Sequence, residues 1–169
     1  MYDWDLGDSV FNAWVRLRQV WEAVKKYSEL ELEPYQATFP QIDILMILSV
    51  STRPLTPTEI ASYVFRELHS VSEFLTRMER SGYVKKVRSR KDRRVVRVRI
   101  QPKGEELLRQ TVGSGFPSAY WIMKSYLSEE EIKQLDLLLK KLRDGALQEM
   151  GLKAEPLPDI LDARGMVGS

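Results

Sequence analysis

The stretch that decides the fold is VSEFLTRMERSGYVKK at residues 71–86, followed closely by KDRRVVRVRIQPKG at residues 91–104. In the first segment the apolar residues recur at spacings of three and four, a pattern typical of an amphipathic helix. The pattern predicts a helix over about 68–81 that is closed by Gly82, because glycine readily adopts the left-handed conformation that ends a helix. Its apolar face consists of Val71, Phe74, Leu75 and Met78.

Two strands are expected after this helix, over about 83–88 and 94–101. In the second strand Val96, Val98 and Ile100 alternate with arginines, so one face is apolar and the other is basic. The turn between the strands, SRKDR at residues 89–93, is also strongly basic. The sequence therefore predicts a β-hairpin with a charged tip and a charged outer face.

A short helix is expected upstream, over about 57–63. Thr56 suits the N-cap, Pro57 suits the first helical position, and Glu59 completes a capping box. Two short helices joined by a tight break form a helix-turn-helix, and a hairpin directly after it makes a winged helix. The expected fold class is mainly α with a small two-to-three-stranded β wing.

Charge is distributed unevenly along the chain. The whole sequence carries a net charge of +2, whereas residues 85–103 hold ten basic residues and one acid, Asp92. A concentrated positive patch on an otherwise acidic chain indicates a polyanionic partner, and double-stranded DNA is the partner that suits a winged helix. The alternatives are a solvated basic strand and a winged helix that contacts another protein without specific DNA binding.

Residues 55–103 resemble the winged helix of the MarR family of bacterial transcription regulators. The resemblance rests on LTPTEIASYV at residues 55–64 and on the two segments quoted above, and with the flanking helices it covers about residues 8–148. It implies a homodimeric, sequence-specific regulator that reads a pseudo-palindromic DNA site. It also implies that Arg94 enters the minor groove and that Asp92 braces the wing. Phe65-Arg66-Glu67 departs from the small, often glycine-containing turn of the family.

Candidate DNA-binding residues lie on the face of the 68–81 helix that its apolar residues leave free. A recognition helix reads base edges mainly with its N-terminal half, whereas basic residues further along contact phosphates. The base-reading candidates are His69, Ser70, Ser72 and Glu73, and the phosphate candidates are Arg77 and Arg80. Two alternatives are open: an ion pair of Glu73 with Arg77, and a local bond of His69 at the start of the helix.

Candidates in the hairpin are the basic residues near its tip. An arginine at that place gains from the negative potential of a narrow minor groove. The candidates are Arg90, Lys91, Arg93 and Arg94.

Helices on both sides of the winged helix (about 38–102) are expected to form a homodimer. They span about 8–30 and 103–148, and residues 149–169 are expected to be a loosely ordered tail. The first helix carries an apolar seam of the coiled-coil type, and the last begins with a capping box at Ser128. The seams fit a second subunit or an intramolecular core equally well. Their residues are Val10, Trp14, Leu17, Trp21 and Val24 in the first helix and Ile132, Leu135, Leu139, Leu142 and Ala146 in the last.

GSGFP at residues 113–117 interrupts the helical pattern between about 103–112 and 118–126. The segment is a tolerated kink, or a hinge and wall of an effector cavity. A small hydrophobic or aromatic effector is the expectation for such a cavity, although aromatic residues at helical spacing also form cores. The aromatic residues nearest the break in this interpretation are Trp14, Trp21, Phe116, Tyr120 and Trp121.

Composition excludes several classes of protein. The chain has no cysteine and one histidine, His69, which removes disulfides, thiolate chemistry and Cys/His zinc sites, so no metal and no cofactor are expected. We find no phosphate-binding loop and no nucleophile elbow, so an enzyme is not expected. The longest apolar run, Ile44–Leu48, is far too short for a membrane span, and the acidic N-terminus lacks the features of a signal peptide. A soluble cytoplasmic protein is the expectation.

Overall fold

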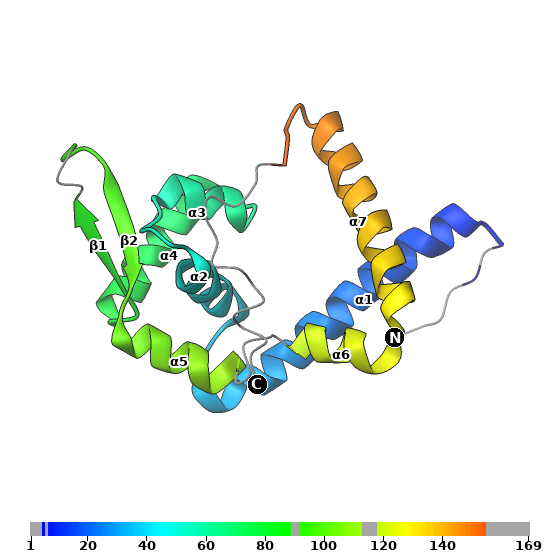
Figure 1. Ribbon diagram of the computed structural model, residues 1–169, viewed down its shortest axis with the longest axis horizontal. Coiled ribbons are helices and arrows are strands. Elements are labelled where there is room, and N and C mark those ends of the chain that lie inside the picture. The colour runs from blue at the N-terminus through cyan, green and yellow to red at the C-terminus, as the bar shows by residue number, and fades with distance from the viewer. Residues whose placement is uncertain (1–4, 6, 89–91, 113–117, 155–169) are drawn as a thin grey trace.

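The computed structural model describes residues 5, 7–88, 92–112 and 118–154, and every structural statement below concerns those ranges. The elements follow one another as predicted, with a hairpin in the middle of a helical chain (Figure 1). In chain order they are α1 (Ser9–Leu32), the 3-10 turn η1 (Glu33–Tyr35), α2 (Phe39–Val50), α3 (Pro57–Tyr63), α4 (Leu68–Arg80), β1 (Val84–Arg88), β2 (Val96–Ile100), α5 (Pro102–Val112), α6 (Ser118–Tyr126) and α7 (Glu129–Glu149).

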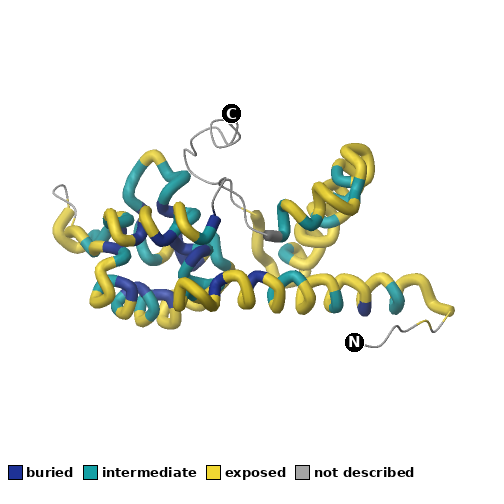
Figure 2. Tube along the Cα trace, turned by 90° about the horizontal axis from the view of Figure 1, so that it is seen from below, coloured by how far each residue is buried: buried dark blue, intermediate teal, exposed yellow. Residues whose placement is uncertain are grey.

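The elements divide into a compact lobe and a helical arm. Helices α2, α3 and α4 pack together with the β1–β2 hairpin, and α5 packs against α2 at the base of this lobe (Figure 1). The long α1 leads out of the lobe, and α6 packs against both α1 and α7. Figure 2 shows that buried residues gather in the lobe, whereas most of α7 and the outer half of α1 are exposed.

The helix starts follow the predicted capping residues. Thr56 Oγ1 accepts the Glu59 N–H at 3.2 Å, and Glu59 Oε2 accepts the Thr56 N–H at 2.7 Å, so the capping box is complete in both directions. Arg53 Nη2 adds an ion pair to Glu59 Oε1 at 2.6 Å, and these donors lower the pKa of Glu59 to about 2. The second predicted box, at Ser128 and Glu131, opens α7.

The hairpin is antiparallel, with Val84 opposite Ile100 and Arg88 opposite Val96. Leu55 forms a single bridge to Val98 on the other side of β2. Of the two to three strands expected, the structure therefore has two, and the third is reduced to this bridge. The predicted basic outer face is wrong in one respect: Arg97 is partly buried and its Nη1 donates to the Pro54 carbonyl at 2.8 Å. Arg97 therefore joins the hairpin to the start of α3, while Arg99 is exposed as predicted.

The core confirms the predicted apolar face of the 68–81 helix. Val71, Leu75 and Met78 are buried, and the partly buried Phe74 packs against the edge of this core. They meet buried residues of every other element of the lobe, among them Leu45, Ile60 and Val98. Burial of this face fixes which side of α4 points outward.

Gly104 lies in the first turn of α5, where the hairpin, α2 and α5 meet. A Cβ atom there would collide with the Tyr83 carbonyl oxygen and would lie 2.9 Å from a Leu45 methyl carbon and 3.0 Å from a carbon of Ile100. We expect Gly104→Ala to lower the free energy of unfolding by about 1–3 kcal/mol, the usual range for overpacking. Chemical denaturation measures this change.

The matched control is Gly145→Ala in α7, where an added Cβ would meet nothing within 4 Å. We expect this variant to be neutral or more stable, because alanine favours a helix interior by about 1 kcal/mol over glycine. Equal losses of stability in the two variants would contradict the packing argument for Gly104.

The two terminal regions differ from the prediction in detail. The first helix does not end near residue 30 but runs to Leu32. Glu33 and Pro34 then form the 3-10 turn η1, after which the helix ends. The buried residues of α1 are Val15, Ser28 and Leu32, not the seam. The seam residues Trp14 and Leu142 are 59% and 61% exposed in the single chain, whereas Val24, Ile132, Leu135 and Leu139 are partly buried. The 113–117 break and residues 155–169 of the predicted tail lie outside the described ranges.

Candidate nucleic-acid interface

Helix α4 presents the predicted base-reading residues on its outer side. His69, Ser70 and Glu73 are exposed, and Ser72 is partly buried beside the hairpin. Because Val71, Leu75 and Met78 anchor the opposite side, these four side chains are held on a rigid element in the first half of the helix. This is the part of a recognition helix that contacts base edges.

Glu73 and His69 contact each other on this surface. Glu73 Oε1 lies 3.3 Å from His69 Nε2, one helical turn away. Glu73 thus contacts His69 and not Arg77, and the contact of His69 is to a side chain one turn further along the helix. Arg77 instead covers the ring of Phe74, with 5.3 Å between the guanidinium carbon and the ring centre. Arg77 lies on the side of α4 that is turned toward α2.

Lys86 in β1 is a basic residue of this surface that the sequence analysis did not select. Its Nζ donates to Thr76 Oγ1 at 2.7 Å and to the Ser72 carbonyl at 3.5 Å, and its backbone N–H donates to Glu79 Oε1 at 2.7 Å. These bonds join the hairpin to the middle of α4 and place a positive charge beside Ser72. No spacing in the sequence predicts them, because Lys86 and Thr76 belong to different elements.

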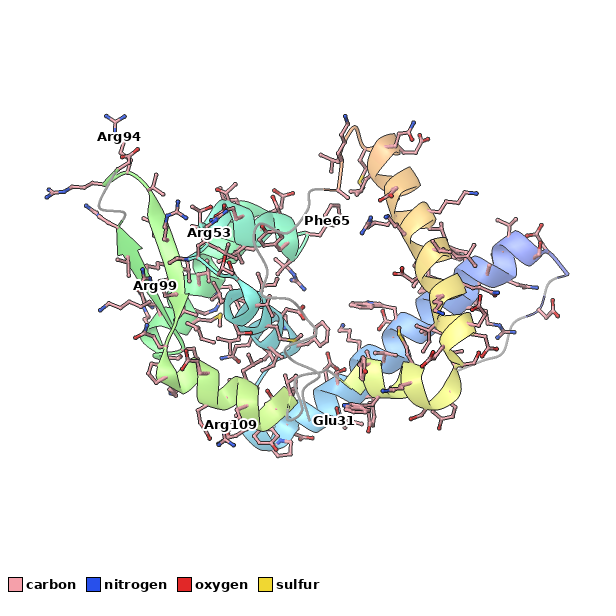
Figure 3. All side chains as sticks on the ribbon, viewed as in Figure 1. Glu31, Arg53, Phe65, Arg94, Arg99 and Arg109 are labelled. Carbon is pink, nitrogen blue, oxygen red and sulfur yellow. The ribbon has the colours of Figure 1, made fainter. Side chains whose placement is uncertain are left out.

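The hairpin turn is held by Asp92. Its Oδ1 accepts the Arg94 N–H at 2.9 Å, and its carbonyl accepts the Val95 N–H at 3.0 Å. Arg93 and Arg94 are exposed, and Arg94 extends beyond the end of the hairpin, away from the helices (Figure 3). The geometry supports a bracing role for Asp92. Arg90 and Lys91 lie outside the described residues.

The turn between α3 and α4 is closed by a bulky residue in the left-handed region. Phe65 has φ +50° and is 63% exposed, at a position where glycine would be unstrained (Figure 3). The Arg66 N–H donates to the Ala61 carbonyl at 3.0 Å, which ends α3. Helix α4 nevertheless begins at Leu68, as predicted.

A cavity of about 140 Å³ lies between the arm and the lobe. We call it the interdomain cavity; α1, α2, α5 and α6 all contribute to its wall. Trp21 and Phe39 form its aromatic side, with their ring centres 6.1 Å apart and their planes at 87°. Of the aromatic residues proposed from the sequence only Trp21 lines it; Trp14 is paired with Phe11, Tyr120 is paired with Trp121, and Phe116 is outside the described ranges.

A second cavity, of about 280 Å³, lies between α2 and the inner flank of α4. We call it the recognition-helix cavity. Arg66, Ser70, Phe74 and Arg77 line it, and Asp43 of α2 belongs to both cavities. In the ranges that the structure describes, no cluster of three or more histidine or acidic side chains is arranged for a metal ion. None of the described helices combines the length and hydrophobicity needed to cross a membrane.

Comparison with known proteins matches residues 35–95 to the model of the MarR family. The transcriptional regulator MgrA of Staphylococcus aureus is 29% identical over 116 residues, which are 69% of this chain and 76% of MgrA. The names of these relatives are those of transcriptional regulators.

Solved structures agree with the family model. AbsC of Streptomyces coelicolor, a MarR family regulator, superposes with a TM-score of 0.74 at 22% identity, over 85% of this chain and 97% of AbsC. The MepR–DNA complex of S. aureus superposes with a TM-score of 0.70 at 25% identity, over 78% of this chain and 96% of MepR. The organohalide-sensing regulator RdhR with bound 2,4-dichlorophenol superposes with a TM-score of 0.68 at 25% identity, over 86% of this chain and 85% of RdhR. The resemblance predicted from the sequence is confirmed: residues 35–95 match the model of the MarR family, and the fold of this chain is a winged helix-turn-helix.

Proposed function

We propose that this protein is a homodimeric, sequence-specific DNA-binding transcription regulator that reads a pseudo-palindromic site and is released by a small hydrophobic effector. The observation that carries the proposal is the lobe in which Lys86 joins the basic hairpin to the exposed α4, while Asp92 holds the turn of the hairpin. Affinity arises from neutralised phosphates, and specificity from base contacts of α4.

The proposed base contacts are made by His69, Ser70, Ser72 and Glu73. Arg77 is proposed to contact a phosphate, and the hairpin residues Arg90, Lys91, Arg93 and Arg94 to contact the backbone and the minor groove. The MepR relative in complex with DNA supports this use of the fold. Glu73 is the distinctive member, since a carboxylate accepts from cytosine N4 but repels phosphate.

The proposed homodimer is supported by apolar side chains that one chain leaves uncovered. Val10, Trp14, Leu17 and Trp21 on α1 are exposed, and so are Trp121 and Tyr126 on α6 and Leu138 and Leu142 on α7. Large apolar side chains exposed in such number on three helices support an interface with a second copy of the chain. A two-fold dimer presents its two recognition helices symmetrically, which calls for a pseudo-palindromic site.

The proposed effector binds in the interdomain cavity, whose walls come from both the arm and the lobe. A ligand there contacts α1 and α2 together, so it favours one relative orientation of arm and lobe over another. The relative RdhR with bound dichlorophenol supports a small aromatic molecule.

The proposal is tested by selecting binding sites from random double-stranded DNA. We expect the wild-type protein to enrich a two-fold symmetric sequence with half-sites about one helical turn apart, roughly 34 Å. The Glu73→Ala variant should change the preferred base at one symmetric pair of positions, by about 1–3 kcal/mol per contact.

The matched control is Glu149→Ala at the end of α7, which removes the same exposed charge far from the lobe. It should enrich the wild-type sequence. If the wild-type protein enriches no sequence, a winged helix that contacts proteins is the better interpretation; an unchanged preference of Glu73→Ala would remove Glu73 from the base-reading set.

A further inference from the structure

Asp43 on α2 is the residue that the linings of the two cavities have in common. Its side chain is partly buried, and among the described residues it takes part in no hydrogen bond and no ion pair. Burial raises the pKa of Asp43 to about 6, and the positive charge of Arg66 opposes this rise only in part. A carboxylate in this position is costly when ionised, because burial disfavours the charged form.

The other charged groups around Asp43 do not neutralise it. In the interdomain cavity Lys25 points to Glu29, with 3.9 Å between Nζ and Oε1, and Glu29 is not part of the lining. Glu31 binds the Tyr27 hydroxyl, which raises the pKa of Tyr27. From the other side Arg66 and Arg77 face the recognition-helix cavity, and neither lies within ion-pair distance of Asp43. The interdomain cavity therefore has an excess of negative charge.

The remaining walls of this cavity are apolar and aromatic. Trp21 and Phe39 meet edge to face, and Val24, Leu32, Ile42 and Met46 surround them. A volume of about 140 Å³ is the size that holds a single benzene-sized ring. Aromatic rings also attract cations through their faces, most strongly in the case of tryptophan.

We propose that the interdomain cavity binds small hydrophobic cations, of the size of an aromatic amine with one ring, and that Asp43 is their counter-ion. The inference rests on the proposed function, since it names the chemical class of the effector. A cation supplies the partner that the Asp43 carboxylate lacks. A neutral ring of the same size leaves the carboxylate unpaired, and an anion is repelled by Asp43 and Glu31.

Asp43 also links ligand binding in the interdomain cavity to the DNA-binding surface of α4. The carboxylate borders the cavity that holds Arg66, Ser70 and Arg77, at the start and on the flank of α4. A cation that draws the carboxylate toward α1 removes a negative charge from beside these arginines. A ligand at Asp43 therefore changes the charge beside α4, and it changes DNA affinity to the extent that its own affinity differs between the free and the DNA-bound protein.

The test is a titration of the full-length protein with three molecules of one skeleton: 2-phenylethylammonium, 2-phenylethanol and phenylacetate. We expect calorimetry to show the ammonium binding about tenfold or more tightly than phenylacetate, with the alcohol between them. Affinity for the ammonium should rise as the pH passes upward through about 6, because Asp43 ionises while the amine stays protonated. Affinity for the alcohol should not rise over the same pH range, because a neutral ligand supplies no partner to the carboxylate.

The Asp43→Asn variant should lose the preference for the ammonium. Its thermal unfolding temperature at neutral pH should equal or exceed that of the wild type, since the amide removes a partly buried charge. Glu22→Gln is the matched control: it removes an exposed carboxylate of α1 outside the lining and should keep the preference. Phenylacetate binding as tightly as the ammonium, a preference that survives in Asp43→Asn, or no binding of any of the three molecules would overturn the proposal.

DNA binding without ligand is measured on the same preparations. A wild-type protein that binds its selected DNA but does not prefer the cation refutes this inference and leaves the proposed function intact. A protein that prefers the cation but selects no DNA refutes the proposed function and supports the ligand class.

Discussion

Replacing Trp14 by glutamate is expected to convert the protein to a folded monomer and to lower its affinity for the selected DNA by about 100-fold or more. Trp14 is 59% exposed in the single chain, so the lobe does not depend on it. In the proposed dimer the new carboxylate would be buried without a partner, which strongly disfavours association. A monomer also loses the gain that comes from binding two linked half-sites. Sedimentation and DNA titration measure the two effects.

Ala23→Glu is the matched control for this variant. Ala23 is exposed on α1 and lies about two and a half turns from Trp14, on the opposite side of the helix. It introduces the same charge and should leave both the mass in solution and the DNA affinity unchanged. A wild-type protein that sediments as a monomer at micromolar concentration would remove the dimer from the proposal.

Loss of the wing arginine is the second large effect. Arg94→Ala is expected to lower affinity about tenfold or more for specific and non-specific DNA alike, because Arg94 extends from the end of the hairpin (Figure 3) and a contact with the DNA backbone carries no sequence information. Each neutralised phosphate contributes about −0.9 to the slope of log K against log salt, so a dimer that loses two such contacts should have a slope smaller by about 1.8. Titrations at several salt concentrations measure both quantities.

Lys141→Ala provides the comparison, since it removes an exposed charge of α7 far from the hairpin. Its affinity and salt slope should match those of the wild type. Wild-type affinity of Arg94→Ala for both kinds of DNA would show that the wing is not positioned as proposed.

Local patterns in the sequence determined most of the secondary structure. The capping boxes at Thr56 and Ser128, the apolar repeat of α4 and the alternation of β2 each involve residues within one turn or one strand. Their energetics depend on neighbours in the chain, so spacing is sufficient to predict them. The same patterns identified the outer residues of α4 and the basic hairpin, since the buried face of an amphipathic helix implies its exposed face.

Tertiary packing decided what each side chain meets beyond its own element. The bond from Lys86 to Thr76, the bond from Arg97 to Pro54 and the choice of Trp21 over Trp14 for the interdomain cavity all join segments whose spacing in the sequence carries no signal. Asp43 is the clearest case. In the sequence it is one acid in an apolar helix. In the fold it borders two cavities, one lined by α1 and the other by α4, and that position, not its residue type, makes its charge available to a ligand.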